Sequence, residues 1–108
     1  MIYLNQGGRL TNLCPQMALA VVMVDQAYES FVPETWVTSV NDGTHGPTSL
    51  HPKGQAVDFR LHNVYKPTRP ALVEHIKRRL NHGEGQFEVY WEAIGTENEH
   101  LHLEYDPK

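Results

Sequence analysis

Three short segments of this chain alternate apolar and polar residues, and this alternation restricts the possible fold more than any other feature. The segments are residues 55–61, 87–91 and 101–105. Because successive side chains of a β-strand point to opposite faces of a sheet, each segment predicts a strand with one apolar and one polar face. A fourth segment, 35–40, is rich in β-branched and aromatic residues and also predicts a strand.

Two further segments have the spacing of amphipathic helices. In residues 15–31 apolar side chains recur at intervals of three and four, and Pro15 suits a first helical turn because it lacks a backbone N–H. The second segment runs from about residue 70 to residue 81, with Thr68 as the predicted cap. The order of helix, strands, helix, strands predicts an α+β fold with a largely antiparallel sheet and two main helices.

The length and charge of the chain narrow the classes of protein to consider. With 108 residues it has the size of one domain, so residues 1–108 are expected to form a single unit. The formal charge is −4, from 9 Lys+Arg and 13 Asp+Glu, and a nucleic-acid partner would require clustered basic residues instead. The lone Cys14 has no internal disulfide partner.

The apolar run Met17 to Val24 is far shorter than the about 20 residues that a membrane-spanning helix needs. The N-terminal residues lack the basic and apolar regions of a signal peptide. We therefore expect a soluble protein that is made in the cytoplasm, without membrane insertion. A monomer without a nucleic-acid partner is expected.

Histidines next to carboxylates suggest the chemistry of this chain. Seven residues are histidines, and the first informative segment, Ser-Leu-His-Pro-Lys-Gly-Gln-Ala-Val-Asp, contains His51 and ends at Asp58. Ligand atoms lie about 2 Å from a zinc ion, so the chain must reverse between these two residues if both bind one metal. The turn formers Pro52 to Gly54 can supply that reversal. If this segment is considered alone, the simpler interpretation is that His51 lies at the surface and that Asp58 is an unrelated strand residue.

The second informative segment is Glu-Asn-Glu-His-Leu-His-Leu-Glu, residues 97–104. Spacing of two places His100 and His102 on one face of a strand. Glu99 would point to the other face of a regular strand, so a site shared with His102 requires that the regular strand begin near His100. Glu104 is expected on the face opposite His102, with a structural role. A pair of surface histidines is the alternative interpretation of this segment.

Together the two segments supply His51, Asp58 and His102, which form a plausible three-ligand zinc set with one position open for water. A zinc ion at such a site lowers the pKa of water to about 7. A carboxylate within hydrogen-bond reach can then accept the proton.

The two motifs resemble those of a family of zinc peptidases. The family includes D-Ala-D-Ala carboxypeptidases and L-alanyl-D-glutamate endopeptidases of bacteria and phages, and it shares its fold with the Hedgehog signalling domain. The family pattern Ser-x-His-x-x-Gly-x-Ala-x-Asp is complete here from Ser49 to Asp58, and Glu-x-x-His is present at Glu99 and His102. The short loop from Asp42 to His45 looks most like that of compact phage or prophage members.

The resemblance implies a role for each matched residue. His51, Asp58 and His102 would hold one Zn²⁺ per chain, and Glu99 would be the catalytic general base. Ser49 would help to position the substrate. His100, which shares a strand face with His102, would be an auxiliary hydrogen-bond donor to the site and is the second choice as a ligand.

One departure from the family pattern concerns substrate binding. Many members carry an arginine in a Ser-Gly-Tyr-Arg stretch upstream of the first zinc ligand, and the matching stretch here, residues 37–42, contains none. His45 or Arg60 could take its place, although neither matches the family motif.

The expected function is therefore that of a zinc metallopeptidase, a hydrolase acting on peptidoglycan stem peptides. It would be a carboxypeptidase or an endopeptidase on peptides that contain D-amino acids, and it would degrade the cell wall as a phage or prophage endolysin does. The resemblance implies a protein that is made in the bacterial cytoplasm and acts at the cell wall or in the periplasm once released. Two alternatives stay open: a non-catalytic, zinc-stabilised wall-binding or structural module of the same fold, and a metal-free interaction domain with surface histidines.

Overall fold

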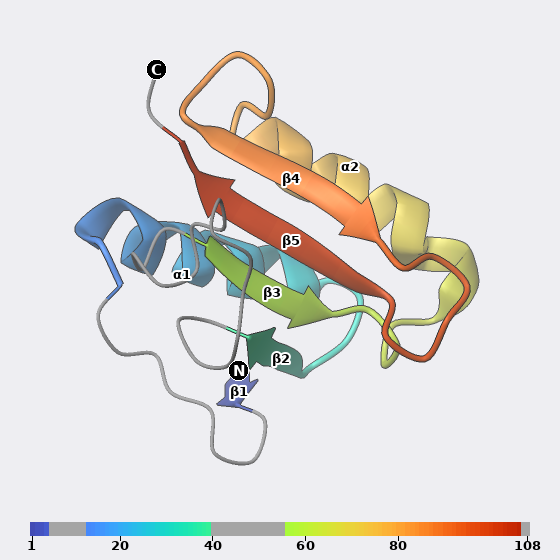
Figure 1. Cartoon of the computed structure of the whole chain (residues 1–108). Helices are drawn as coiled ribbons and strands as arrows, with labels where there is room; N and C mark the ends of the chain where they lie inside the picture. Colours follow the sequence, from blue (N-terminus) through green and yellow to red (C-terminus); the bar gives the residue numbers. More distant parts are fainter. Residues whose placement is uncertain (5–12, 40–55, 107–108) are drawn as a thin grey trace.

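The computed structural model describes residues 1–4, 13–39 and 56–106, and these ranges form one α+β unit (Figure 1). Three predicted site residues, His45, Ser49 and His51, lie outside the described residues.

The described strands form one sheet in the order β1-β2-β3-β5-β4. Their bounds are β1 Ile2–Leu4, β2 Thr35–Ser39, β3 Ala56–Arg60, β4 Phe87–Glu92 and β5 His100–Tyr105. β1 pairs with β2 in parallel, and the other described pairs are antiparallel. The predicted α+β fold with a largely antiparallel sheet is thus confirmed. β1 was not predicted, because three residues are too few for an alternation to be recognised.

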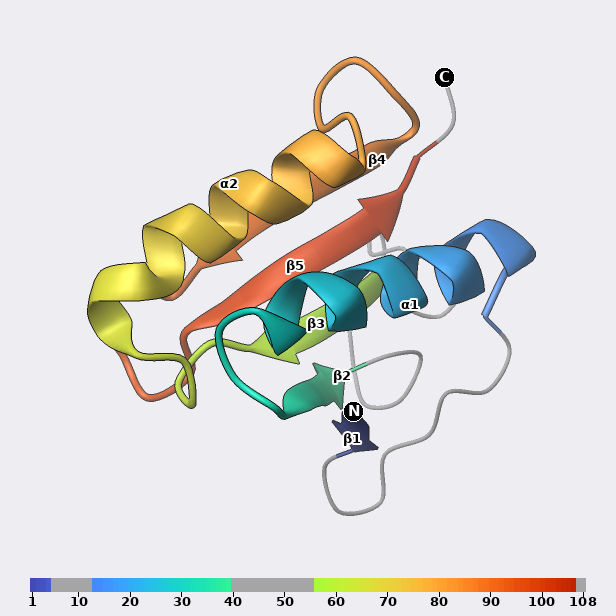
Figure 2. The ribbon, with the colours of Figure 1, turned by 180° about the vertical axis from the view of Figure 1, so that it is seen from behind.

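Two helices pack on the same face of this sheet (Figure 2). Helix α1 spans Pro15–Glu29, and helix α2 spans Arg69–Arg79 after the short 3₁₀ turn η2, Lys66–Thr68. Thr68 is the N-cap residue of α2, as predicted, but its hydroxyl donates to the carbonyl oxygen of Tyr65 at 2.6 Å and makes no cap bond to the helix. In the part of the chain that the structure describes, no helix is long and apolar enough to cross a membrane.

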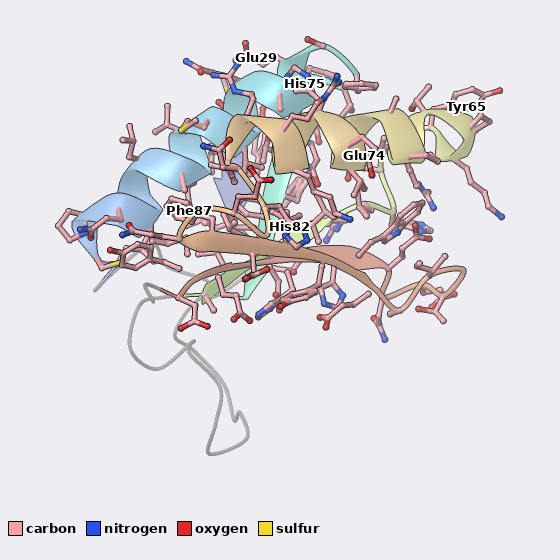
Figure 3. All side chains as sticks on the ribbon, turned by 90° about the horizontal axis from the view of Figure 1, so that it is seen from above. Glu29, Tyr65, Glu74, His75, His82 and Phe87 are labelled. Atoms are coloured by element: carbon pink, nitrogen blue, oxygen red, sulfur yellow. The ribbon has the colours of Figure 1, made fainter. Side chains whose placement is uncertain are left out.

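The core lies between the helix layer and the sheet, as the view in Figure 3 shows. Tyr28 of α1 and Phe59 of β3 are fully buried there. Leu101 and Leu103 of β5 are each 1% exposed, whereas the residues between and beside them remain partly exposed on the other face of the sheet. The polar residues of the alternating segments therefore gather on the face that α1 and α2 leave uncovered.

Candidate functional site

Two of the predicted zinc ligands meet on the face of the sheet opposite α1 and α2. The antiparallel register of β3 and β5 places Asp58 directly opposite His102. Asp58 Oδ1 lies 2.8 Å from His102 Nδ1, and each side chain is 16% exposed. Strand pairing thus brings together two residues that are 44 positions apart in the sequence.

A second carboxylate holds the other nitrogen of the same ring. Glu104 Oε1 lies 2.8 Å from His102 Nε2. The prediction that Glu104 points away from His102 is therefore wrong, because a period of two places residues 102 and 104 on the same strand face. The ring of His102 lies between two carboxylates, and Glu104 has a direct role in orienting it.

These carboxylates also change the proton affinity of His102. Burial by itself lowers the pKa of the imidazole, but the hydrogen bond and the charge of Asp58 act in the opposite direction, as does the hydrogen bond of Glu104. The net result raises the pKa of His102 from 6.5 to about 9. The raised pKa favours the imidazolium form of His102 at neutral pH, in which both ring nitrogens can donate to the two acids.

The donor arrangement fits a zinc site. Histidine ligands of metals usually donate the second ring N–H to a carboxylate, which is the position of Glu104. Loss of its proton would then make Nδ1 of His102, which faces Asp58, the atom that binds a metal. Asp58 Oδ1 lies 2.8 Å from this nitrogen, in a hydrogen bond that a shared metal would replace.

The described residues do not by themselves supply a complete set of metal ligands. Within residues 1–4, 13–39 and 56–106, no group of three or more His, Cys, Asp or Glu side chains is arranged so that it could hold a metal ion. The predicted third ligand, His51, lies outside those ranges, so the full ligand set stays a prediction.

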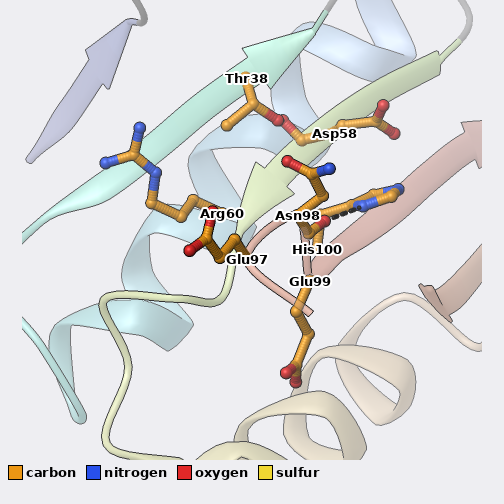
Figure 4. Close-up of a pocket in the computed structure, with 7 residues that line it drawn as sticks. All are labelled: Thr38, Asp58, Arg60, Glu97, Asn98, Glu99 and His100. Carbon is orange, nitrogen blue, oxygen red and sulfur yellow. Dashed lines mark hydrogen bonds between the residues drawn. The ribbon is translucent and has the colours of Figure 1, made fainter. Parts of the chain in front are cut away.

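Glu99, the predicted general base, is held by a different set of partners. Its Oε1 accepts hydrogen bonds from Arg69 Nη1 at 2.8 Å and from the backbone N–H of Gly95 at 3.1 Å. Its Oε2 accepts from Trp91 Nε1 at 2.7 Å. Glu99 is 3% exposed, and its carboxylate points away from Asp58 toward the helices (Figure 4). Strand β5 does begin at His100, as a site shared by Glu99 and His102 requires.

The surroundings of Glu99 favour its ionised form. Burial would raise the pKa of this carboxyl, but the hydrogen bonds from Gly95 and Trp91 and the charges of Arg69 and Lys66 outweigh it, so the pKa lies below its usual range. Such a carboxylate is a weak proton acceptor while these contacts last. The role of Glu99 as general base stays a prediction, and its contacts give it a second role in fixing the loop that precedes β5.

His100 is also held at both ring nitrogens. Nδ1 lies 2.8 Å from the carbonyl oxygen of Asn98, as the dashed line in Figure 4 marks, and Nε2 lies 2.9 Å from Glu92 Oε1. Because a carbonyl oxygen can only accept, Nδ1 carries the proton of this bond. The ring is thereby fixed at the edge of the site, and its function as an auxiliary donor stays a prediction.

A pocket of about 340 Å³ adjoins the Asp58 carboxylate (Figure 4). Three strand residues line it, Thr38 of β2 and Asp58 and Arg60 of β3. The other lining residues are 97–99, in the loop before β5, and His100, the first residue of β5. The guanidinium carbon of Arg60 lies 4.9 Å from the centre of the Trp36 ring. The structure thus places Arg60, a predicted substrate-binding residue, in the same pocket as a predicted metal ligand.

Tyr90 is a site residue that the sequence did not identify. It lies directly opposite His102 in the pairing of β4 with β5, and the two rings stack with centroids 6.1 Å apart. Its side chain is 43% exposed. Trp91 points to Glu99 and the core, and neighbouring residues of a strand point to opposite faces. Alternation along β4 could therefore have placed Tyr90 on the face that carries His102.

Comparison with protein-family models, with curated proteins and with solved structures finds no match for this chain. The functional argument therefore depends on the geometry of the site and on the two sequence motifs.

Proposed function

We propose that this protein is a zinc-dependent peptidase that hydrolyses peptide bonds in peptidoglycan stem peptides. The observation that carries the proposal is the arrangement of Asp58, His102 and Glu104 on one face of the sheet. It supplies an oxygen and a nitrogen donor close together, with a carboxylate behind the histidine, which is the arrangement that zinc sites use.

In this proposal Asp58, His102 and His51 hold the metal. The chemistry that bound zinc supplies is Lewis acidity, which polarises the scissile carbonyl and makes water acidic enough to attack near neutral pH. Glu104 keeps Nδ1 of His102 directed at Asp58 by holding Nε2. As general base, Glu99 would have to exchange its contacts with Arg69 and Trp91 for a contact with water.

The adjoining pocket supports a short peptide as the substrate. Its volume of about 340 Å³ lies near the lower end of the range of about 300–1,000 Å³ for small-molecule sites. Polar side chains line it, which suits the many hydrogen-bonding groups of a peptide backbone. Two parts of the proposal are supported by the resemblance of the two motifs and not by the pocket. These are peptides with D-residues as the substrate class and action at the cell wall as a phage or prophage endolysin.

The proposal is tested first by elemental analysis of the purified protein, with one zinc per chain as the expected result. Release of new amino termini from cell-wall fragments is then measured with and without a chelator. We expect His102→Ala to lose both the zinc and the activity. His75→Ala, on helix α2, is the matched control and should retain both. Absence of metal-dependent release by the unmodified protein would refute the proposal.

One observation favours a second candidate function, the non-catalytic zinc-stabilised wall-binding or structural module. The carboxylate of Glu99 is already bound to Arg69, Trp91 and Gly95, so a catalytic base would have to be freed first. In this second candidate the metal contributes folding energy, and a chelator unfolds the domain. Zinc content of one per chain with no release of amino termini, and a chelator-dependent loss of the circular dichroism signal, would favour it.

A further inference from the structure

We infer that a second pocket, which borders Glu99 on the side of helix α2, binds a phosphate group through Lys66 and Arg69. This pocket has a volume of about 230 Å³ and shares only Glu97 and Glu99 with the pocket beside Asp58. Neither of the predicted metal ligands that the structure describes lines it. The phosphate site needs neither the metal nor the peptide substrate, so it goes beyond the proposed function and does not rest on it.

Three nitrogen-bearing side chains of one short segment line this second pocket, namely His62, Lys66 and Arg69. Lys66 is the first residue of η2, and Arg69 is the first residue of α2, three positions later. Side chains three positions apart in a 3₁₀ turn lie above one another, so these two cations emerge on the same side of the chain. The segment from 62 to 69 thus brings several hydrogen-bond donors to one cavity.

Both cations keep donor capacity in the described part of the chain. A guanidinium has five N–H groups. Three of those of Arg69 are used, by Nε to the carbonyl oxygen of Val64 at 2.9 Å, by Nη1 to Glu99 at 2.8 Å and by Nη2 to the carbonyl oxygen of His62 at 3.2 Å. One N–H on each end nitrogen therefore remains, in a side chain that is only 11% exposed. Among the described residues the ammonium group of Lys66 forms no hydrogen bond or ion pair, although its charge acts on Glu99.

A phosphate group matches these donors better than a carboxylate does. A carboxylate has two oxygens in one plane, whereas a phosphate group directs its oxygens to several sides, and the donors come from three positions of the chain. The fork of arginine and the point charge of lysine are both common phosphate ligands. The volume of about 230 Å³ lies below the range of about 300–1,000 Å³ for small-molecule sites. The pocket therefore suits one small group and not a length of peptide.

The two acidic residues of the lining do not exclude an anion. The charge of Glu99 is compensated by its ion pair with Arg69 at 2.8 Å. Glu97 is exposed, so the solvent screens its charge. A bound phosphate group would share Arg69 with Glu99, and its negative charge would weaken the hold of Arg69 on that carboxylate. Phosphate binding in this pocket is therefore coupled to the contacts of Glu99.

NMR tests this coupling, because the two tryptophans serve as reporters. The indole N–H of Trp91 donates to Glu99 at 2.7 Å, and that of Trp36 donates to Glu34 at 2.8 Å. Sodium phosphate is titrated into the isotope-labelled full chain at pH 7, and sodium chloride is lowered in step to keep the ionic strength constant. We expect the indole resonance of Trp91 to shift and saturate, while that of Trp36 stays in place. The spectrum of Trp36→Phe assigns the two resonances.

Lys66→Gln should weaken phosphate binding roughly 3- to 10-fold, because it removes one charged donor from the pocket. Lys66 is exposed, so this change should leave the fold intact. Lys77→Gln is the matched control, since Lys77 lies in the last turn of α2 and does not line the pocket. It should bind phosphate as the unmodified protein does. Glycerol 3-phosphate, titrated in the same way, distinguishes the sources: binding of both ligands assigns the site to a phosphate group on a larger molecule, and binding of inorganic phosphate alone assigns it to the free ion.

Three results would overturn the phosphate site. These are a Trp91 resonance that does not respond to phosphate, a Trp36 resonance that shifts as far as that of Trp91, and a Lys66→Gln variant that binds phosphate as tightly as the unmodified protein. Because the titration contains no peptide, failure to cleave cell-wall fragments leaves the phosphate site standing. Absence of phosphate binding likewise leaves the proposed peptidase standing.

Discussion

Replacing Glu99 by glutamine tests how the loop before β5 is held. The substitution keeps the size of the side chain and removes its charge. In the native structure Oε1 accepts from Arg69 and Gly95, and Oε2 accepts from Trp91. Glutamine has one oxygen, so if that oxygen takes the place of Oε1, the new NH2 group faces the N–H of Trp91 as donor against donor.

The expected loss in the free energy of unfolding is about 3 kcal/mol. Breaking a buried ion pair by removing one partner costs about 3–5 kcal/mol. The side chains of Arg69 and Glu99 are 11% and 2% exposed, so solvent compensates little of this cost. The lower end of the range applies because Arg69 keeps two other acceptors, the carbonyl oxygens of Val64 at 2.9 Å and His62 at 3.2 Å.

Urea denaturation at pH 7 measures this loss. With an m value of about 2 kcal/mol/M, the midpoint of Glu99→Gln should fall by about 1.5 M. Glu97→Gln, the same change two residues earlier at an exposed position, should stay within about 0.5 kcal/mol of the unmodified protein. A loss below about 1 kcal/mol for Glu99→Gln would show that the ion pair with Arg69 does not hold the loop.

The pH dependence of this stability has a defined sign. Because the pKa of Glu99 is lowered by folding, its contribution is fully present above the ordinary value of 4.5 and is lost as the pH falls through the lowered value. The difference in stability between the unmodified protein and Glu99→Gln should therefore narrow below pH 4.5. A difference that stays constant from pH 7 down to the acid transition would contradict the assignment.

Three further predictions concern the site and the core. In the chelator-treated protein, NMR titration should give His102 a pKa of about 9, and Asp58→Asn should lower it; an unchanged value would exclude Asp58 as the cause. Since folding raises this pKa from 6.5, the contribution of protonated His102 to the stability of the fold is full below pH 6.5 and is lost as the pH rises through about 9. Glu104→Gln should weaken zinc binding about 10- to 100-fold, measured by competition with a chelator, and unchanged affinity would argue against an orienting role. Phe59→Ala should cost about 3–5 kcal/mol in urea denaturation, because this ring is fully buried between sheet and helices.

The strand faces of the site could be read from the sequence, and the partners across strands could not. Alternation correctly separated Leu101 and Leu103 from His100 and His102. The position of Glu104 was wrong only because the period of two was applied incorrectly, and the sequence contained the information needed. By contrast, the stacking of Tyr90 on His102 depends on the register between β4 and β5, which no single strand encodes.

Glu99 illustrates what a motif leaves open. Its spacing of three from His102 is part of the resemblance, but spacing specifies distance along the chain and not the direction of the side chain. That direction depends on Arg69, 30 positions earlier, and on Trp91, both of which offer donors on the helix side of the sheet. An ion pair between residues so far apart in sequence forms only once α2 has packed against the sheet.

The sequence by itself determined the class of the fold and the residues that form the helices and most strands. It also contains the two motifs, each of which places histidine and carboxylate residues in one short segment. These properties follow from local periodicity, because side-chain direction repeats every two residues in a strand and every 3.6 in a helix. The tertiary structure decided that Asp58 meets His102, that Arg60 lies over Trp36 and that Glu99 turns to Arg69. Those contacts depend on strand register and helix packing, which are set by the fit of many side chains in a shared core and not by any one segment.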